Sequence, residues 1–181
     1  NFIESKGYRE VLKLVLKAKE ERKGDVLHFH FAGKFFKKEE EEYFFSFIQE
    51  HHLDSSITYH GIVSGQKKNE LLHLCHIFIL LTRYPNEGQP ISILEAMGNG
   101  MSIITTDHAG IPDIANNENG FVCPKDNIQI ESVFRYLLDC YQYRDLLRNV
   151  CLKNYDLART LYTENQYIHN MDKIFEEVCH E

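Results

Sequence analysis

Residues 76–106 contain the feature that most constrains the fold of this chain. An apolar segment at 77–81 is followed by a polar turn, a second apolar run at 90–97 and a third apolar segment at 103–105. A strand, a turn, a helix and a strand within about 30 residues form one βαβ unit. The first strand is apolar at nearly every position, which is typical of a strand buried on both faces of a parallel sheet. This stretch therefore predicts an α/β fold.

The same alternation of helix and strand extends over the rest of the chain. We predict helices at 8–23, 37–51 and 66–74, strands at 26–32 and 57–60, a helical turn at 110–113, a strand at 120–123, and closing helices at 126–142, 143–157 and 163–179. Gly24 is expected to stop the first helix and Asp126 to begin a helix. Pro90 is expected to occupy the first position of its helix, which Gly98 or Gly100 ends in a left-handed cap. The order predicts a doubly wound, Rossmann-like parallel sheet with helices on both faces and a helical C-terminus.

Length and charge set limits on the class of protein. The 181 residues suggest one domain, which we place at 1–181, and the formal net charge of −7 disfavours a nucleic-acid partner. No apolar run approaches the roughly 18 residues that a transmembrane helix needs, and no signal peptide is recognisable. The chain opens at Asn1 rather than at a methionine, so we expect it to be a piece of a longer protein.

Several common functional motifs are missing. The five cysteines form no C-x-x-C pair and are interpreted as reduced thiols of a cytosolic protein. The sequence has no glycine-rich dinucleotide fingerprint in the right context, no phosphate-binding P-loop, no G-x-S-x-G elbow and no D-x-D pair to anchor a metal. His28 and His30 share one strand face without a third ligand nearby, so we interpret them as structural.

Two acids stand out instead, because Glu87 and Glu95 lie eight positions apart around the start of the helix at 90–97. A carboxylate accepts hydrogen bonds from two hydroxyls, and the N–H groups at a helix start bind an anion. From Pro90 to Glu95 the helix rises by about 7–8 Å, so the two acids can meet one ligand at different places. This suits a long ligand with a polyol at each end and phosphate between, such as a nucleotide sugar. A helix-terminal charge at Glu87 and a solvent-facing Glu95 explain the spacing equally well.

A resemblance covers nearly the whole chain. The central motif Glu87-Gly88-x5-Leu94-Glu95-Ala96-Met97 is preceded by Lys6-Gly7, Phe31-Ala32-Gly33 and Tyr59-x-Gly61, and is followed by Ile104-x-Thr106-x-x-Ala109-Gly110-Ile111-Pro112-Asp113 and Asn119-Gly120-Phe121-Val122. In this order the motifs resemble the retaining glycosyltransferases of family four, which have the GT-B fold and an E-x7-E signature. The sequence around Glu87 is similar to that of family members that build bacterial capsule, O-antigen or exopolysaccharide.

The resemblance implies a role for each matching residue. Glu87 would contact the donor sugar near the reacting carbon, and Glu95 would hold the ribose hydroxyls of the nucleotide. The diphosphate would be neutralised by Lys6 and by backbone N–H groups around Gly88, Gln89, Ile91 and Ser92, while Ile62 would lie beside the nucleobase. Because GT-B enzymes usually need no bound metal, we expect no metal or other cofactor, with a nucleotide diphosphate sugar as the donor substrate.

The sequence departs from the family pattern in three places. The family often has an arginine five residues before the lysine, where this chain has Asn1, and Pro90 removes one N–H from the donor loop. We also expect the family's N-terminal acceptor domain to lie outside this chain. Since the last helix of the family usually packs toward that domain, we expect the helix that follows Thr163 to expose apolar surface.

Our hypothesis from the sequence is the C-terminal, donor-binding half of a bacterial retaining glycosyltransferase. The full enzyme would transfer a sugar to a glycan or lipid-linked acceptor in the cytoplasm, with peripheral association at the inner face of the membrane left open. The fragment alone is expected to be inactive. Two alternatives remain at this point: a non-transferring GT-B enzyme such as a sugar-nucleotide epimerase, and a nucleotide-binding scaffold half-domain that needs a partner chain.

Overall fold

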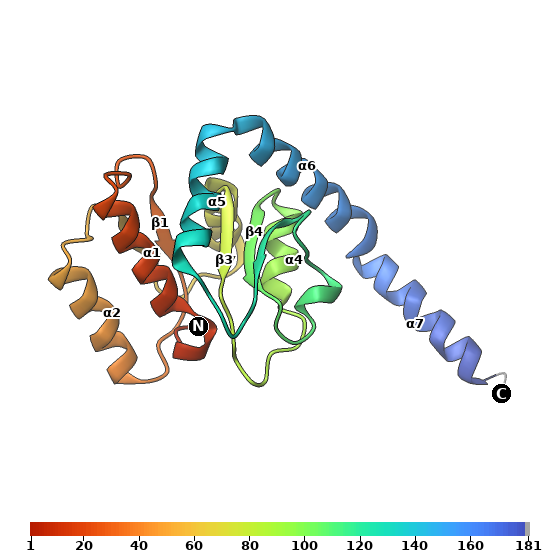
Figure 1. Ribbon diagram of the computed structural model, residues 1–181. Helices are drawn as coiled ribbons and strands as arrows, with labels where there is room; N and C mark the ends of the chain where they lie inside the picture. The colour runs from red at the N-terminus through yellow and green to blue at the C-terminus, as the bar shows by residue number, and fades with distance from the viewer. Residues whose placement is uncertain (180–181) are drawn as a thin grey trace.

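The computed structural model describes residues 1–179, which form an α/β domain with a long helical C-terminus (Figure 1). The strands are β1 (Phe29–Phe31), β2 (Ile57–Tyr59), β3 (Ile77–Leu80), β4 (Ser102–Thr106) and β5 (Gly120–Cys123). The helices are α1 (Tyr8–Glu20), α2 (Lys38–Glu50), α3 (Gly65–Leu74), α4 (Ile91–Gly98), α5 (Ile130–Gln142), α6 (Arg144–Leu161) and α7 (Glu164–Cys179). Two short 3₁₀ turns lie at Glu4–Lys6 (η1) and Ile111–Asp113 (η2).

All of the strand pairs are parallel, which confirms the predicted α/β class. In the register, Ile79 lies opposite Ile104, and Ile104 lies opposite Phe121. The strands are divided between two sheets, β1-β2 and β3-β4-β5, whereas we expected one. Hydrophobic patterning identifies each strand but not its neighbours, which is why the division was not predicted.

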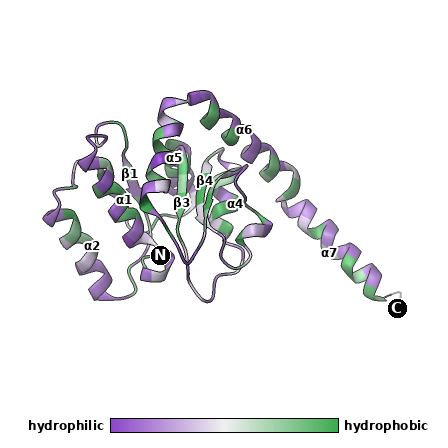
Figure 2. Ribbon diagram, viewed as in Figure 1, coloured by the Kyte–Doolittle hydropathy of each residue, from purple (hydrophilic) through white to green (hydrophobic). Residues whose placement is uncertain are grey.

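Helices cover both faces of the three-stranded sheet, as predicted. Successive residues of a strand point to opposite faces, so Ile104 packs with Leu12 of α1 and Phe134 of α5, while Ile103 packs with Met97 of α4. Residues of α3 and α6 join Ile103 on its side of the sheet. Figure 2 shows hydrophobic residues concentrated on these strands and on the inward sides of the helices.

The N-terminal segment joins the carboxyl ends of β1 and β3. The Phe2 N–H donates to the Lys34 carbonyl oxygen at 2.9 Å, and the Arg83 N–H donates to the Ser5 carbonyl oxygen at 2.6 Å. Gly7 then starts α1 with a φ of 82°, and a Cβ there would lie 2.2 Å from the carbonyl oxygen of Leu81. Only glycine fits this left-handed conformation so close to another backbone, and the close approach places Lys6 at the end of β3.

Several predicted boundaries were wrong. Helix α1 ends at Glu20, because Arg22 adopts the left-handed conformation with a φ of 55°; Gly24 is not the stop. The strand predicted at 26–32 is confined to β1. Helix α5 begins at Ile130 rather than near Asp126, whose carboxylate accepts a hydrogen bond from Lys125 instead.

The ends of α4 differ in how well the sequence predicted them. Pro90 has a φ of −66° but an extended ψ of 108°, so it precedes the helix as the N-cap and does not occupy its first position. At the other end, Gly100 has a φ of 70°, and the Met101 N–H donates to the Ala96 carbonyl oxygen at 3.0 Å. These features form the predicted left-handed glycine cap.

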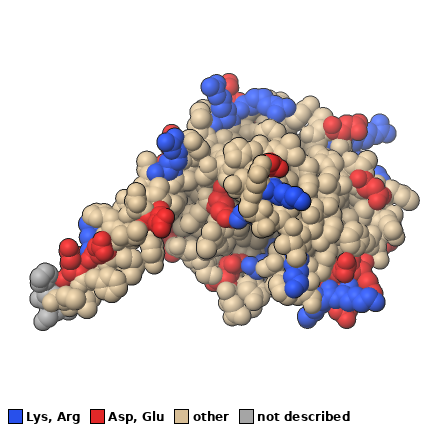
Figure 3. Space-filling model, turned by 180° about the vertical axis from the view of Figure 1, so that it is seen from behind, with Lys and Arg blue, Asp and Glu red and all other residues tan. Residues whose placement is uncertain are grey.

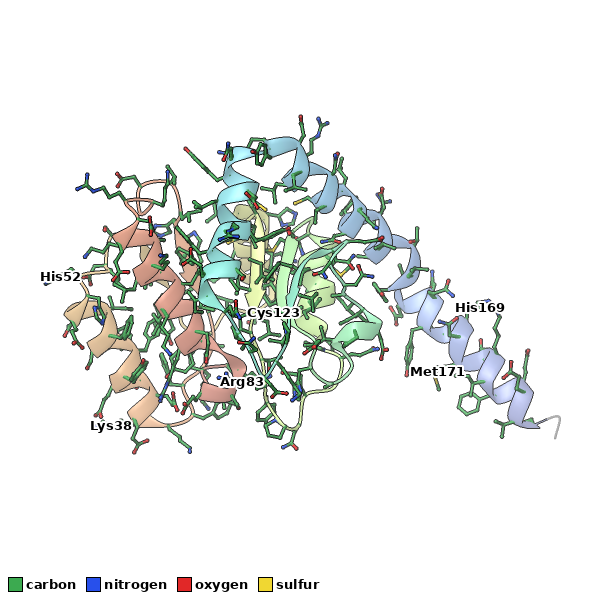
Figure 4. All side chains as sticks on the ribbon, viewed as in Figure 1. Lys38, His52, Arg83, Cys123, His169 and Met171 are labelled. Atoms are coloured by element: carbon green, nitrogen blue, oxygen red, sulfur yellow. The ribbon has the colours of Figure 1, made fainter. Side chains whose placement is uncertain are left out.

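Helix α7 projects away from the rest of the domain, as Figure 1 shows. It contains no buried residue, and His169 and Met171, labelled in Figure 4, extend from its free sides. Its large apolar side chains are exposed at Tyr167, Ile168, Ile174, Phe175 and Val178. The expectation that this helix exposes apolar surface is therefore confirmed.

Charges of both signs are mixed on the face drawn in Figure 3, so the described residues on that face form no continuous basic surface. Opposite charges pair locally, as in Lys17 with Glu21 at 2.9 Å and Lys38 with Glu42 at 3.2 Å. Among residues 1–179, no helix combines the length and the apolarity that crossing a bilayer requires.

Candidate functional site

Glu87 lies in the loop between β3 and α4, and its side chain is only 9% exposed. Its Oε2 atom lies 3.2 Å from the Nζ of Lys6 and accepts a hydrogen bond from Thr82 Oγ1 at 3.0 Å. Two residues predicted from the sequence, Lys6 and Glu87, are thus brought into direct contact. A carboxylate this deeply buried needs such partners, because an unpaired buried charge is strongly destabilising.

Thr82 is the structural partner of Glu87 that sequence reasoning missed. It is fully buried, and its carbonyl oxygen accepts a hydrogen bond from Thr106 Oγ1 at 2.6 Å. Its hydroxyl also accepts the Tyr84 N–H at 3.1 Å, which helps to turn the loop back toward Glu87. Its position as the first polar residue after an apolar strand was the available signal, because ligands bind at the carboxyl ends of parallel strands.

Arg83 and His108 connect the loop between β3 and α4 to neighbouring parts of the domain through hydrogen bonds. The Arg83 guanidinium donates from Nη2 to Oε1 of Glu10 on α1 at 2.5 Å, and Figure 4 labels Arg83 near the N-terminal helices. The His108 ring forms a hydrogen bond between Nε2 and the Tyr84 carbonyl oxygen at 2.7 Å. The Lys6 ammonium also lies 5.0 Å from the centre of the Tyr84 ring, within the range of a cation–π contact.

The predicted anion-binding residues form an exposed turn that leads into α4. Gly88 and Gln89 are exposed, and the Gly110 N–H donates to the Gly88 carbonyl oxygen at 3.3 Å. In the described part of the chain, the N–H groups of Gly88, Gln89, Ile91 and Ser92 have no hydrogen-bond acceptor. Free N–H groups at a helix start, together with the helix dipole, favour a bound anion.

Glu95 lies one turn further along α4, on the same face as Ile91, which is 70% exposed. The Glu95 side chain is 37% exposed, and its Oε1 atom lies 2.5 Å from the Nζ of Lys68 on α3. Sequence reasoning missed Lys68, because the two residues are 27 positions apart and no local pattern connects them. Within residues 1–179, no hydrogen bond or ion pair joins Glu95 directly to Glu87.

Ile62, the predicted neighbour of the nucleobase, lies between β2 and α3 and is 72% exposed. The preceding Gly61 has a φ of 65°, so the chain turns sharply before Ile62. An exposed isoleucine at a strand end offers an apolar surface to a planar ring, although no residue of the described chain packs closely enough to bury it.

His28 and His30, which we interpreted as structural, form polar contacts between the segments that contain β1 and β2, with His28 just before β1. His28 Nε2 lies 2.8 Å from Thr58 Oγ1, and His30 Nδ1 lies 2.9 Å from His60 Nε2. Burial lowers the pKa of His30, and the neighbouring His28 and His60 lower it further. No set of three or more His, Cys, Asp and Glu side chains in the described residues is placed to hold a metal ion.

The five cysteines are unpaired, in agreement with their interpretation as thiols. Burial raises the pKa of Cys123 to about 11. Figure 4 labels Cys123 in the interior of the domain, at the end of β5. A buried thiol with a raised pKa is a poor nucleophile, so Cys123 is a packing residue.

A parallel α/β domain with a buried acid and free backbone N–H groups at the carboxyl ends of its strands belongs to the class of open α/β folds, which bind their ligands at that edge. The family model described as "Glycosyl transferases group 1" matches residues 1–149. The chain therefore belongs to the group 1 glycosyltransferase family.

One curated relative is WcaL of Salmonella typhimurium, whose name assigns it to colanic acid biosynthesis as a glycosyltransferase. It is 26% identical over 87 residues, which cover 45% of this chain and 21% of the relative. The chain thus matches only about a fifth of that protein's length.

Solved structures share the fold, and two of them illustrate the likeness. Anabaena Alr3699/HepE in complex with UDP has a TM-score of 0.83 and 13% identity, with 98% of this chain and 47% of that chain covered. The pneumococcal O-GlcNAc transferase GtfA, in complex with UDP and GlcNAc, has a TM-score of 0.78 and 20% identity, with 100% and 35% covered. The neighbours are GT-B glycosyltransferases, so the predicted GT-B fold is confirmed.

Proposed function

We propose that this chain is the donor-binding part of a retaining glycosyltransferase, in which the full protein transfers a sugar from a nucleotide diphosphate sugar to a glycan or lipid-linked acceptor. The observation that carries the proposal is the arrangement of Glu87 with Lys6, Glu95 with Lys68, and free backbone N–H groups between them. Membership of the family supports the reaction class.

In this proposal the donor lies along the start of α4. Glu95 accepts hydrogen bonds from the two ribose hydroxyls, and the exposed side chain of Ile62 contacts the nucleobase. The diphosphate meets the N–H groups of Gly88, Gln89, Ile91 and Ser92. Lys6 supplies the cation for the diphosphate, so the donor is proposed to bind without a metal ion or another cofactor.

The chemistry follows from the charge that develops when the bond between the sugar carbon and the diphosphate oxygen breaks. The leaving diphosphate gains negative charge, which Lys6 and the N–H groups stabilise more strongly in the transition state than in the bound donor. Glu87 lies beside Lys6 and is held by Thr82. In this proposal its carboxylate holds the donor sugar next to the reacting carbon.

The biological setting is proposed from the relatives. The name of WcaL points to colanic acid biosynthesis, and HepE and GtfA were solved with UDP. We therefore propose a role in bacterial surface polysaccharide biosynthesis in the cytoplasm, with the acceptor held by a further, N-terminal domain of the whole protein. A lipid-linked acceptor would bring the full enzyme to the inner face of the membrane as a peripheral protein.

The experiment is an assay of the full-length protein with a panel of UDP- and GDP-sugars and candidate acceptors. Release of free nucleotide should depend on the acceptor, and NMR of the product should show the anomeric configuration of the donor retained. Glu87→Gln should abolish transfer while UDP or GDP still binds. An inverted product would contradict the retaining reaction. Conversion of the donor sugar without any acceptor would instead favour an epimerase.

A further inference from the structure

The ion pair between Lys68 and Glu95 suggests a second component of the nucleotide site. Lys68 lies in the first turns of α3, and its Nζ is 2.5 Å from Oε1 of Glu95. We propose that Lys68 is a positioning residue that holds the Glu95 carboxylate in the orientation in which it accepts the ribose hydroxyls. This inference rests on the function proposed above and extends it to a residue outside the E-x7-E motif.

Apolar packing between α3 and α4 directs Lys68 toward Glu95. Lys68 and Leu72 are four residues apart and therefore lie on the same face of α3. Leu72 and Leu94 both pack against the apolar cluster that contains Ile93. The Lys68 side chain consequently lies at the junction of the two helices and is 36% exposed.

The pair has little to contribute to folding, since ion pairs exposed to this degree are weakly stabilising. What it does restrict is the Glu95 side chain, which would otherwise sample several rotamers in solvent. A carboxylate oriented before the ligand arrives binds more tightly, because less ordering is needed on binding.

The carboxylate still has room for the ligand when Lys68 is bound. Two carboxylate oxygens offer about four lone-pair sites, and Lys68 occupies one of them on Oε1. The other sites can accept the 2′- and 3′-hydroxyls of a ribose. The ammonium has three donors, so Lys68 need not leave when the nucleotide binds.

The neighbouring Lys67 offers a matched control. It is exposed and forms no ion pair within the described residues, yet it carries the same charge on the same turn of α3. Lys67→Met and Lys68→Met therefore change the net charge equally, and only Lys68→Met removes the contact with Glu95. Lys68→Arg keeps a cation with several donors at the position.

The test is calorimetric titration of the wild type and the three variants with UDP and GDP, and with their 2′,3′-dideoxy analogues, which lack both ribose hydroxyls. The ratio of the dideoxy Kd to the ribose Kd measures recognition of the hydroxyls. From hydrogen bonds to a charged group we expect a ratio of at least about tenfold in the wild type. In Lys68→Met this ratio of Kd values should fall to about three or less. In Lys67→Met and Lys68→Arg the ratio should stay close to the wild-type value.

An unchanged ratio in Lys68→Met would overturn the inference, even if both nucleotides bound more weakly, because Lys68 would then act only through its charge. An equal loss in Lys67→Met would overturn it as well. Thermal melts should show the variants folded. If the folded wild type bound neither UDP nor GDP, the proposed function would fail together with this inference, whereas binding with an unchanged ratio rejects Lys68 alone.

Discussion

The Lys6 ammonium lies 3.2 Å from Oε2 of Glu87, although the two residues are 81 positions apart in the chain. The contact exists because the N-terminal segment is hydrogen-bonded to the loop after β3 through Ser5 and Arg83. In the proposed site, the same ammonium therefore faces both the acid beside the donor sugar and the departing diphosphate.

The first prediction concerns Lys6→Met. Charge-assisted hydrogen bonds to a phosphate contribute about 1.5–3 kcal/mol, so UDP or GDP should bind at least about tenfold more weakly. The corresponding nucleoside, which has no phosphate, should bind unchanged. Calorimetry measures both affinities, and Lys13→Met on α1, which removes an exposed cation, is the control. An equal loss for nucleoside and nucleotide would show that Lys6 does not contact the diphosphate.

A second prediction concerns Asn154 on α6, which is fully buried. Its amide donates to the carbonyl oxygens of Met101 and Asn119, each at 2.8 Å, and its Oδ1 accepts from the Asn119 side chain at 2.9 Å. Asn154→Ala leaves the Met101 carbonyl oxygen and the Asn119 side-chain amide without these partners, although the Asn119 carbonyl oxygen keeps the Ile103 N–H. The free energy of unfolding should therefore fall by about 2–4 kcal/mol in urea denaturation.

Asn149→Ala on the same helix is the control for Asn154→Ala, because Asn149 is exposed. Its effect on the free energy of unfolding should stay within about 0.5 kcal/mol. Similar losses in the two variants would mean that helix propensity, rather than the buried network, explains the result.

The sequence predicted the layers of this fold because the layers depend on local periodicity. Successive residues of a strand point to opposite faces, so apolar residues at both Ile103 and Ile104 indicate a strand covered on both faces. Helix ends were less predictable, since several residues compete for each cap: we expected Gly24 to stop the first helix, but Arg22 adopts the left-handed conformation that ends α1.

The site was predictable only in part, for a related reason. The positions of Glu87, Glu95 and Lys6 were found because family motifs mark them. The partners Thr82 and Lys68 depend on contacts across the fold, as does the division of the strands into two sheets. No spacing rule within a single segment contains that information.

A third prediction concerns pH and His30, whose pKa is lowered by burial and by the nearby His28 and His60. The unfolded chain therefore binds a proton more readily than the folded chain at this residue. Its contribution to stability should be complete above the usual histidine value of about 6.5 and should be lost as the pH falls below it.

His30→Asn should accordingly show a smaller decrease in Tm between pH 7.5 and pH 5.5 than the wild type, as measured by circular dichroism. His169→Asn on the exposed helix α7 should leave the wild-type decrease unaltered. If His30→Asn retained the whole decrease, the acid sensitivity would have to come from other groups.

The central claim is that this chain binds the nucleotide of a sugar donor through Glu95, and calorimetric titration of the 181-residue protein with UDP and GDP tests it most directly. We predict that one of these nucleotides binds the wild type and that Glu95→Ala weakens its binding by about 10- to 100-fold, as expected for hydrogen bonds to a charged group. A folded sample that bound neither nucleotide, or an unchanged affinity in Glu95→Ala, would contradict the account.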